Sequence, residues 1–263
     1  MRVGVLNVHI WSDARSRSNV DAVIELLGSL DCDVVTLHEV LRDGPQLDRV
    51  ARALSMRYEL GAAAWLGNAV LSRHPIERVE THEITASYEE GRCVVCATIA
   101  APDGAFDVCA THLDPMYEQT RLDELARLEA ALSKRAGAHL VTGDFNALRL
   151  TDYNGSALAD VRSKRARADR EEPRGDVIAR LDALGYFDAY RLARAGHVGE
   201  YREALLRPLP VAECSTCWVG TRIDYVWASP AMLDRYAVTA ARHVPTECTD
   251  HAAVVVEFAP AAH

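Results

Sequence analysis

Apolar residues occur along the chain in short runs that are separated by polar or turn-forming positions. Runs of this length, bounded by Gly, Pro, Asn or Asp, are typical of β-strands. Pro102-Asp103-Gly104 in addition predicts a hairpin turn between two consecutive strands. The strands that this pattern predicts lie at 3–8, 34–37, 69–71, 92–100, 106–111, 140–142, 222–228 and 252–258.

Four other segments repeat apolar residues with a period near 3.6, which predicts helices with one buried face. They begin near Ser18, Pro45, Thr120 and residue 176 and end near Leu30, Leu54, Leu132 and Leu184. Between about 151 and 220 the pattern is otherwise polar or irregular. Because strands outnumber helices and several are consecutive, we expect an α/β (α+β) fold with two sheets flanked by helices. No linker divides the chain, so we expect one domain over 1–263 with an insertion at about 151–220.

Composition narrows the class of protein only a little. The chain has 263 residues, 49% of them hydrophobic, and a net charge of −9, which argues mildly against nonspecific binding to long nucleic acid without excluding a nuclease. No apolar run approaches the roughly 20 residues of a membrane span. The seven cysteines are an odd number and no secretion signal precedes the first strand, so we expect reduced thiols and a cytoplasmic protein. Cys214 and Cys217 have the spacing of half a zinc site, but no second pair follows, which favours a structural role.

Carboxylate, imidazole and amide side chains recur where the predicted strands begin or end. Such ends can converge on one pocket, and carboxylates gathered there need a cation to hold them together. The pattern therefore predicts a hard metal such as Mg²⁺ beside a His/Asp pair, and hence metal-assisted hydrolysis. The segments that carry the pattern are Leu37-His38-Glu39-Val40, Thr111-His112-Leu113-Asp114, Gly143-Asp144-Phe145-Asn146, Arg222-Ile223-Asp224-Tyr225 and Thr249-Asp250-His251.

The residue types suggest how such a pocket would work. Glu39 follows an apolar strand, where its carboxylate reaches a divalent cation or, alternatively, lies on the surface. Asp144 and Asn146 share a face if the segment is extended, although an Asx turn would give the same residues. Asp224 is a candidate hydrogen-bond partner for His251, which would favour the protonated ring; the alternative is a histidine that only caps or packs.

Taken in order, these segments resemble the endonuclease/exonuclease/phosphatase superfamily of DNase I-like metallohydrolases. The resemblance covers residues 1 to about 258 and is specific for the superfamily, but poorly specific for the substrate. It adds three stretches to the five above, namely Val5-Leu6-Asn7-Val8, Gly67-Asn68-Ala69-Val70-Leu71-Ser72-Arg73 and the looser Glu89-Glu90-Gly91-Arg92.

The resemblance implies a four-layer αββα sandwich with the site at one end of two mixed sheets. It implies that Glu39, with Asn7 and Asp250, binds Mg²⁺ or Mn²⁺, and that Asp144 activates the attacking water. It further implies that Asn146, His112 and His251 hold the scissile phosphate while Asp224 orients His251, and that Asn68 and Arg92 contact the substrate. Three departures from the family pattern stand out, which are His38 before the metal-binding Glu, Thr249 before the final Asp-His, and His9 in place of a nearby acid after the first Asn.

Three classes of function remain open at this stage. The first is a divalent-metal-dependent phosphoesterase that hydrolyses a small or lipid-like phosphate by in-line attack of water, which the acidic chain favours. The second is a DNA or RNA endonuclease or end-processing nuclease, and the third is a noncatalytic binding protein; a non-hydrolytic metal enzyme on a biosynthetic intermediate is a variant of the first. A basic cluster at 162–170 either closes over an anionic substrate or, as we favour, forms a solvated helix face balanced by nearby acids. Trp11 and Trp218 are candidates to line the pocket.

Overall fold

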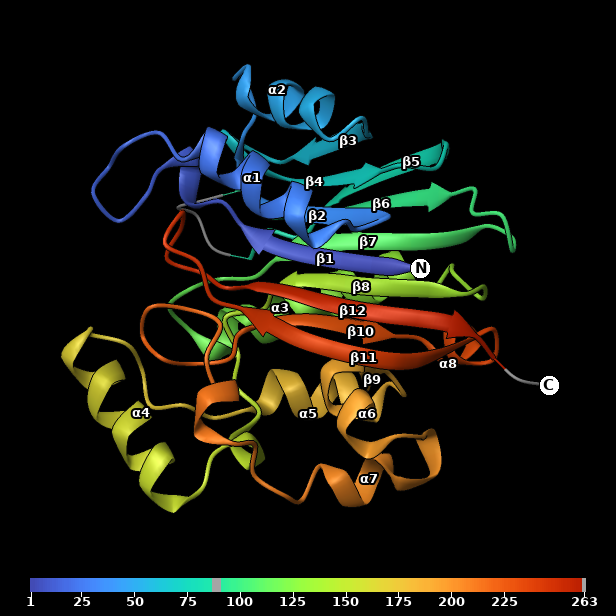
Figure 1. Ribbon diagram of the computed structural model, residues 1–263. Helices are drawn as coiled ribbons and strands as arrows, with labels where there is room; N and C mark the ends of the chain where they lie inside the picture. The colour runs from blue at the N-terminus through green and yellow to red at the C-terminus, as the bar shows by residue number, and fades with distance from the viewer. Residues whose placement is uncertain (87–90, 262–263) are drawn as a thin grey trace.

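The computed structural model describes residues 1–86 and 91–261, and within these ranges twelve strands form two six-stranded sheets (Figure 1). The first sheet has the order β11-β12-β1-β2-β4-β3, with bounds Tyr236–Val244, Ala253–Pro260, Arg2–Asn7, Val34–Leu41, Leu66–Ser72 and Arg57–Ala62. The second has the order β5-β6-β7-β8-β10-β9, with bounds Ile76–Glu83, Cys93–Ile99, Phe106–His112, His139–Asp144, Asp224–Ala228 and Phe187–Asp188. Both sheets are mixed, because β1 and β2, and likewise β7 and β8, run parallel among otherwise antiparallel pairs.

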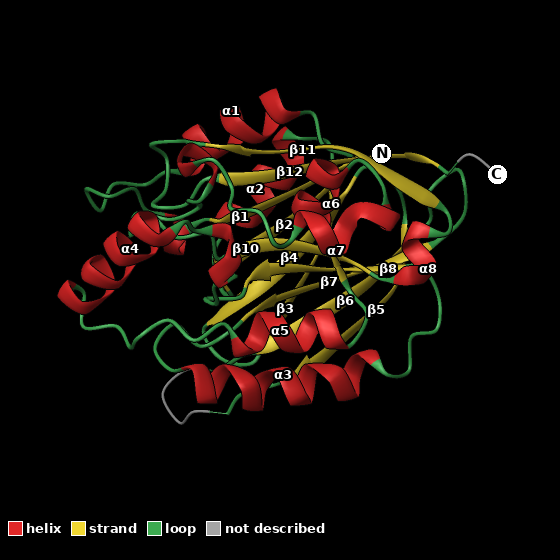
Figure 2. Ribbon diagram, turned by 90° about the horizontal axis from the view of Figure 1, so that it is seen from below, coloured by secondary structure: helices red, strands yellow, loops and turns green. Residues whose placement is uncertain are grey.

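Helices cover the outer face of each sheet. Helices α1 (Val20–Leu30) and α2 (Gln46–Ala53) pack on the first sheet, and α3 (Glu118–Leu132) and α5 (Asp176–Ala183) pack on the second. In the view of Figure 2, α1 lies on one side of the strands and α3 and α5 lie on the other. The predicted four-layer αββα sandwich of two mixed sheets is confirmed. The remaining helical segments are α4 (Gly155–Arg167), α6 (Ala189–Ala195), α7 (Tyr201–Ala204), α8 (Pro230–Leu233), and the short 3-10 turns His9–Trp11, Leu150–Asp152, Val198–Glu200 and Val211–Glu213.

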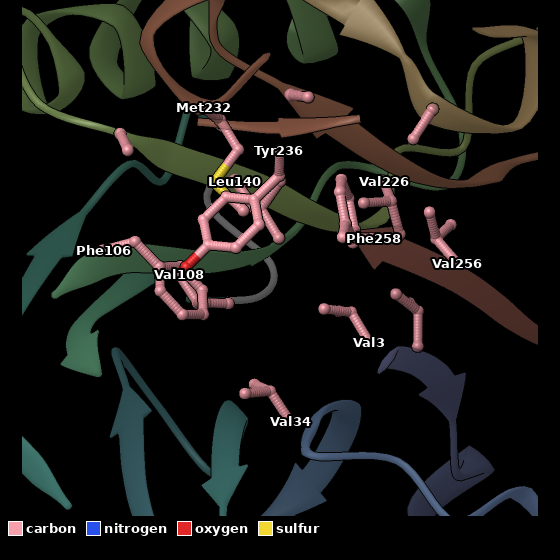
Figure 3. Packing of buried hydrophobic residues seen from close by; sticks show 14 of the residues in the cluster. Val3, Val34, Phe106, Val108, Leu140, Val226, Met232, Tyr236, Val256 and Phe258 are labelled. Carbon is pink, nitrogen blue, oxygen red and sulfur yellow. The ribbon is translucent and has the colours of Figure 1, made fainter. Parts of the chain in front are cut away.

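The main core lies between the two sheets. Small β-branched side chains such as Val3, Val34 and Val256 of the first sheet meet Val108, Val226 and their neighbours from the second (Figure 3). Alternate residues of each inner strand face this core, and the intervening ones face the helices, so both faces of these strands are buried. Burial of apolar surface at about 25 cal/mol per Å² is the main stabilising contribution here.

The segment between 151 and 220 contains more regular structure than its sequence pattern predicts. Helix α4 has no amphipathic period because most of its residues face solvent, and α6 packs beside β10 and β11. A buried ionic network ties this segment to β10. In it, Arg222 forms ion pairs with Asp152 at 2.7 Å and with Asp188 at 2.6 Å.

The cysteines correct one expectation. Cys96 and Cys109 face each other on β6 and β7 with their Cα atoms 4.0 Å apart, and they form a disulfide. The prediction of reduced thiols is therefore wrong for this pair. Strand register brings the two sulfur atoms together, and register cannot be read from the sequence pattern. Cys214 and Cys217 are separate buried thiols. Among the described residues, no helix is long and apolar enough to cross a bilayer.

Candidate functional site

Strand register places three of the predicted residues side by side. His112 at the end of β7 lies opposite Asp144 at the end of β8, and Asp144 lies opposite Asp224 at the start of β10. Neighbouring residues in register point to the same face of a sheet, so these three side chains form one row. Gly143 makes the close approach of β7 possible, because a Cβ there would lie 1.8 Å from the carbonyl oxygen of Thr111.

Asp144 is the centre of this row. Its Oδ2 lies 3.6 Å from Nε2 of His112 and 3.7 Å from Nε2 of His251, and it accepts a hydrogen bond of 3.2 Å from Asn7. Burial, assisted by the nearby charge of Asp224, raises the pKa of Asp144 to about 7, although His251 acts in the opposite direction. The carboxyl group is therefore poised to exchange a proton near neutral pH.

Asp224 and His251 form the hydrogen-bonded pair that the sequence suggests, with 2.9 Å between Oδ2 and Nδ1. Burial opposes protonation of the ring, but the charge of Asp224, its hydrogen bond and the charge of Asp144 together raise the pKa of His251 well above the usual value. His251 precedes β12 and does not begin it. An isolated bridge to Cys217 and a hydrogen bond from Trp218 N to Asp250 O hold it in place.

His112 has the opposite electrostatic character. Burial and the adjacent charge of Arg92 hold the pKa of His112 well below its usual range, so its ring is neutral. Arg92 lies 3.0 Å from Nδ1 of His112, and the amide nitrogen of Asn146 lies 3.1 Å from Nε2. The ring is thus held between two donor groups, with Nε2 3.6 Å from Asp144 Oδ2.

Asn146 reaches the site through a turn, one of the two arrangements that its sequence allows. Its φ of 49° lies in the left-handed region and its backbone N–H donates to Asp144 Oδ1 at 2.9 Å, so the segment is an Asx turn and is not extended. Of the two arrangements that the sequence left open, the structure has the Asx turn and not the extended segment with a shared face, since β8 ends at Asp144. The Asn146 amide nevertheless lies beside His112, with its nitrogen 3.1 Å from Nε2.

Glu39, Asn7 and Asp250 meet at the mouth of the site. Glu39 has a φ of 56° where the pairing of β2 with β4 shifts register, and this irregularity turns its side chain toward Asn7, whose amide donates to it at 3.0 Å. Asp250 Oδ1 and Glu39 Oε2 lie 3.4 Å and 3.8 Å from Nδ1 of His9. Two partly exposed carboxylates, an amide and an imidazole nitrogen are a donor set that fits a divalent cation.

His9 is a candidate metal ligand that the predicted ligand set does not include. It follows β1 in a run of three residues with positive φ, namely His9, Ile10 and Trp11 at 48°, 55° and 61°. Such backbone is strained and is found at functional sites. Its sequence position, two residues after Asn7, is the signal that could have identified it. A separate close group of Asp144, Asp224 and His251 also has the geometry to hold an ion, but there Asp224 is already bonded to His251.

Asn68 lies beneath the site and contacts other protein groups. Its Oδ1 accepts from His38 Nδ1 at 3.0 Å, its Nδ2 donates to Cys93 O at 2.9 Å, and only 3% of the residue is exposed. Burial lowers the pKa of His38 to about 4, so the ring is neutral. These contacts favour a role for Asn68 in supporting β2 below Glu39, and contact of Asn68 with substrate stays a prediction. Contact of Arg92 with substrate also stays a prediction.

Eight of the site residues line a cavity of about 280 Å³, namely His9, Glu39, Arg92, His112, Asp144, Asn146, Asp250 and His251, whereas Asn7, Asn68 and Asp224 lie behind its lining. Sequence reasoning did not favour the two arginines that α4 and the following loop contribute to it, Arg165 and Arg170, and it left out Trp65. Trp218 lines the cavity as expected, whereas Trp11 is buried under α1 and is core. Because α4 carries no hydrophobic period, nothing in the sequence distinguishes Arg165 from its exposed neighbours.

Comparison with known proteins agrees with this geometry. Among solved structures, an endonuclease/exonuclease/phosphatase from Beutenbergia cavernae DSM 12333 superposes with a TM-score of 0.72 at 19% identity, covering 100% of this chain and 72% of that one. The human Nocturnin catalytic domain with bound sulfate gives 0.68 at 18% identity, with 99% and 94% coverage. A mannosyl-6-phosphatase from Bacteroides thetaiotaomicron VPI-5482 gives 0.64 at 15% identity, with 98% and 99% coverage.

These similarities are below 25% identity and show the fold alone. No curated protein matches the chain in sequence. The family model described as "Endonuclease/Exonuclease/phosphatase family" matches residues 10–251, a range that contains every site residue above except Asn7 and His9. The chain therefore belongs to the endonuclease/exonuclease/phosphatase family.

Proposed function

We propose that this protein is a divalent-metal-dependent phosphoesterase that hydrolyses a small phosphate ester. The observation that carries the proposal is the convergence of Asp144, His112 and His251 on one cavity whose mouth holds Glu39 and Asp250. These groups supply a base, two hydrogen-bond donors and a cation site within one small volume. Membership of the endonuclease/exonuclease/phosphatase family supports the proposal, because most members of that family hydrolyse phosphate esters.

The cation site in the proposal consists of Glu39, Asp250 and Asn7, with His9 between the two carboxylates. A bound Mg²⁺ or Mn²⁺ would neutralise a phosphate oxygen and assist the leaving group. Asn7 now donates to both Glu39 and Asp144, so its amide oxygen would have to turn toward the cation to become a ligand. Glu39 and Asp250 need no such change.

Asp144 positions the attacking water and accepts its proton. The carboxyl group is buried, is held by Asn7 and the backbone of Asn146, and has a pKa near neutrality. A base works best when its pKa lies near the working pH. Attack in line with the leaving oxygen requires that the water lie between Asp144 and the phosphorus atom.

His251, His112 and Asn146 stabilise the negative charge that develops on the phosphoryl oxygens. The protonated ring of His251 donates through Nε2 because Asp224 occupies Nδ1. Neutral His112 lies between Arg92 at Nδ1 and Asn146 at Nε2, which hold the ring beside Asp144. Each ring is thus fixed in orientation before the substrate binds, which is the condition for effective electrostatic stabilisation.

The test is a hydrolysis screen of phosphomonoesters, phosphodiesters, lipid phosphates, DNA and RNA with Mg²⁺ and with Mn²⁺. Asp144→Asn should reduce turnover by at least about 100-fold while leaving the fold intact. Asp160→Asn, an exposed change on α4, is the matched control. Hydrolysis that survives Asp144→Asn or excess chelator would refute the mechanism, and turnover of nucleic acid alone would favour the nuclease alternative.

A further inference from the structure

Two arginines in the wall of the cavity have no role in the proposed reaction. Arg165 and Arg170 line it together with the acidic groups at its mouth. Arg165 belongs to α4 and Arg170 to the loop that follows, both within the segment between 151 and 220. In Figure 1, α4 lies at the end of the sandwich where β8 ends and β12 begins, which is the end that carries the site.

Arg165 is only 6% exposed and forms no ion pair with a carboxylate in the described part of the chain. Its Nε donates to Glu171 O at 3.1 Å, while its Nη2 is buried and has no partner among the residues that the structure describes. Arg121 is equally buried nearby but pairs with Glu118 at 2.9 Å and with Glu171 at 2.7 Å. Burial together with the charges of Arg121 and Arg170 lowers the pKa of Arg165. An unpaired buried charge is costly, and an anion bound in the cavity would compensate it.

Arg170 lines the same wall of the cavity and is half-buried. Its Nη1 donates to Pro115 O at 2.8 Å, and within the described ranges it forms no ion pair with a carboxylate. Two solvent-facing basic residues of α4 do have such partners, since Arg162 pairs with Glu172 at 2.5 Å and Lys164 pairs with Asp160 at 2.8 Å. Arg165 and Arg170, in contrast, line the cavity without a carboxylate partner among residues 1–86 and 91–261.

Two exposed tryptophans add a flat apolar surface to the same cavity. Trp65 is 50% exposed and Trp218 is 67% exposed, and both line it. Indole faces beside charged groups suit a sugar or base ring that carries anionic substituents. A volume of about 280 Å³ is at the small end of the range for small-molecule sites.

We propose that the substrate carries two anionic groups, and that Arg165 and Arg170 bind the second one while the first is hydrolysed beside Asp144. The second group is a phosphate or a carboxylate on a compact ring-containing molecule. This inference rests on the proposed phosphoesterase function and narrows its substrate class. In this inference the segment between 151 and 220 selects the substrate, while the residues at the strand ends carry out the hydrolysis.

The test compares binding of matched probes by titration calorimetry, in the Asp144→Asn background with Mn²⁺ present so that no probe is consumed. The pairs are adenosine 3′,5′-bisphosphate with adenosine 5′-monophosphate, and fructose 1,6-bisphosphate with fructose 6-phosphate. We expect the two-anion member of at least one pair to bind about 10-fold more tightly. Adding Arg165→Gln or Arg170→Gln should remove that preference and change the affinity of the one-anion member less than twofold.

Arg167→Gln is the matched control, because Arg167 lies on the same helix, is exposed and bonds only to Ser163 among the described residues. Thermal unfolding identifies any variant that fails to fold. If Arg165→Gln fails to fold, Arg170→Gln provides the test, because Arg170 is only half-buried. Equal binding of both members of each pair, or a preference that survives both substitutions, would overturn the second-anion site. The hydrolysis screen of the parent protein is read separately, so a phosphoesterase without this preference would refute the inference and leave the function standing.

Discussion

Asp224 Oδ2 lies 2.9 Å from His251 Nδ1, and this contact joins the start of β10 to the loop before β12 across 27 residues of sequence. It leaves Nε2 of His251 facing Asp144, at 3.7 Å from its carboxylate. The pair therefore determines both the protonation of the ring and the direction of its remaining N–H. These are the two properties on which the proposed stabilisation of phosphate depends.

Asp224→Asn should lower kcat/KM by about 100-fold, because the lost carboxylate no longer orients His251 or favours its protonated form. The pH profile should move as well. The folded pKa of His251 is raised, so its proton is retained until pH rises well past the ordinary value of 6.5, and without Asp224 it is lost at lower pH. The rate of the variant should then decline at lower pH than that of the parent. Asp234→Asn, an exposed change, is the control; identical alkaline limbs in parent and Asp224→Asn would contradict the assignment.

Glu39→Gln should weaken binding of Mn²⁺ and Mg²⁺ at least about 10-fold, because an amide is a poorer ligand than a carboxylate for a hard cation. Calorimetric titration of the substrate-free protein measures this directly. Glu59→Gln, an exposed change on β3, is the matched control. Unchanged cation affinity in Glu39→Gln would show that the ion binds elsewhere, with the group of Asp144, Asp224 and His251 the first to examine.

Glu124→Gln should flatten the dependence of stability on pH. Burial raises the pKa of Glu124 from 4.5 to about 7, so this group stabilises the fold fully below pH 4.5 and loses that contribution as pH rises through about 7. The neutral variant has no such loss and should gain on the order of 2 kcal/mol relative to the parent between pH 4.5 and pH 8. Urea unfolding at several pH values measures it, with exposed Glu25→Gln as control. Parallel curves for parent and variant would be incompatible with a raised pKa.

Arg222→Met should destabilise the protein by about 3–5 kcal/mol, because it removes the nearest cation from the buried carboxylates of Asp152 and Asp188. The carboxylates would keep only the longer contacts to Arg191 at 3.6 Å and Arg149 at 3.7 Å. The loss should appear in the free energy of unfolding. Exposed Arg202→Gln should leave that free energy nearly unchanged. If Arg222→Met were as stable as the parent, the network would not be what ties the segment between 151 and 220 to β10.

The inner strands were predictable and the edge strands were not. All eight inner strands of the two sheets coincide with predicted apolar runs, because both of their faces are buried. The four strands that the pattern left out, β3, β5, β9 and β11, are the edges of their sheets. An edge strand such as β5, with sequence IERVETHE, is mostly polar and carries no continuous apolar signal.

The site divides in a similar way. Residues at the ends of inner strands, such as Asp144 and Asp224, were found because strand ends can be located from apolar runs. His9 and Trp65 were not favoured because they lie in turns outside the strands, where residue type alone does not indicate direction. Arg165 was not favoured because α4 carries no hydrophobic period that would mark its buried side. At Asn146 the sequence allowed both an extended segment and an Asx turn, and only the structure decided for the turn, in which Asp144 Oδ1 accepts from the Asn146 backbone N–H.

The sequence by itself determined the family, the buried strands and the identity of the acids and imidazoles at their ends, since burial and residue chemistry are local properties of the chain. Tertiary structure alone decided which of these groups touch. Register set His112, Asp144 and Asp224 in one row, the shift at Glu39 turned a carboxylate toward Asn7, and the fold of α4 brought Arg165 to the cavity. The physical reason is that pairing and packing between distant segments, which no local pattern encodes, fix the direction of each side chain.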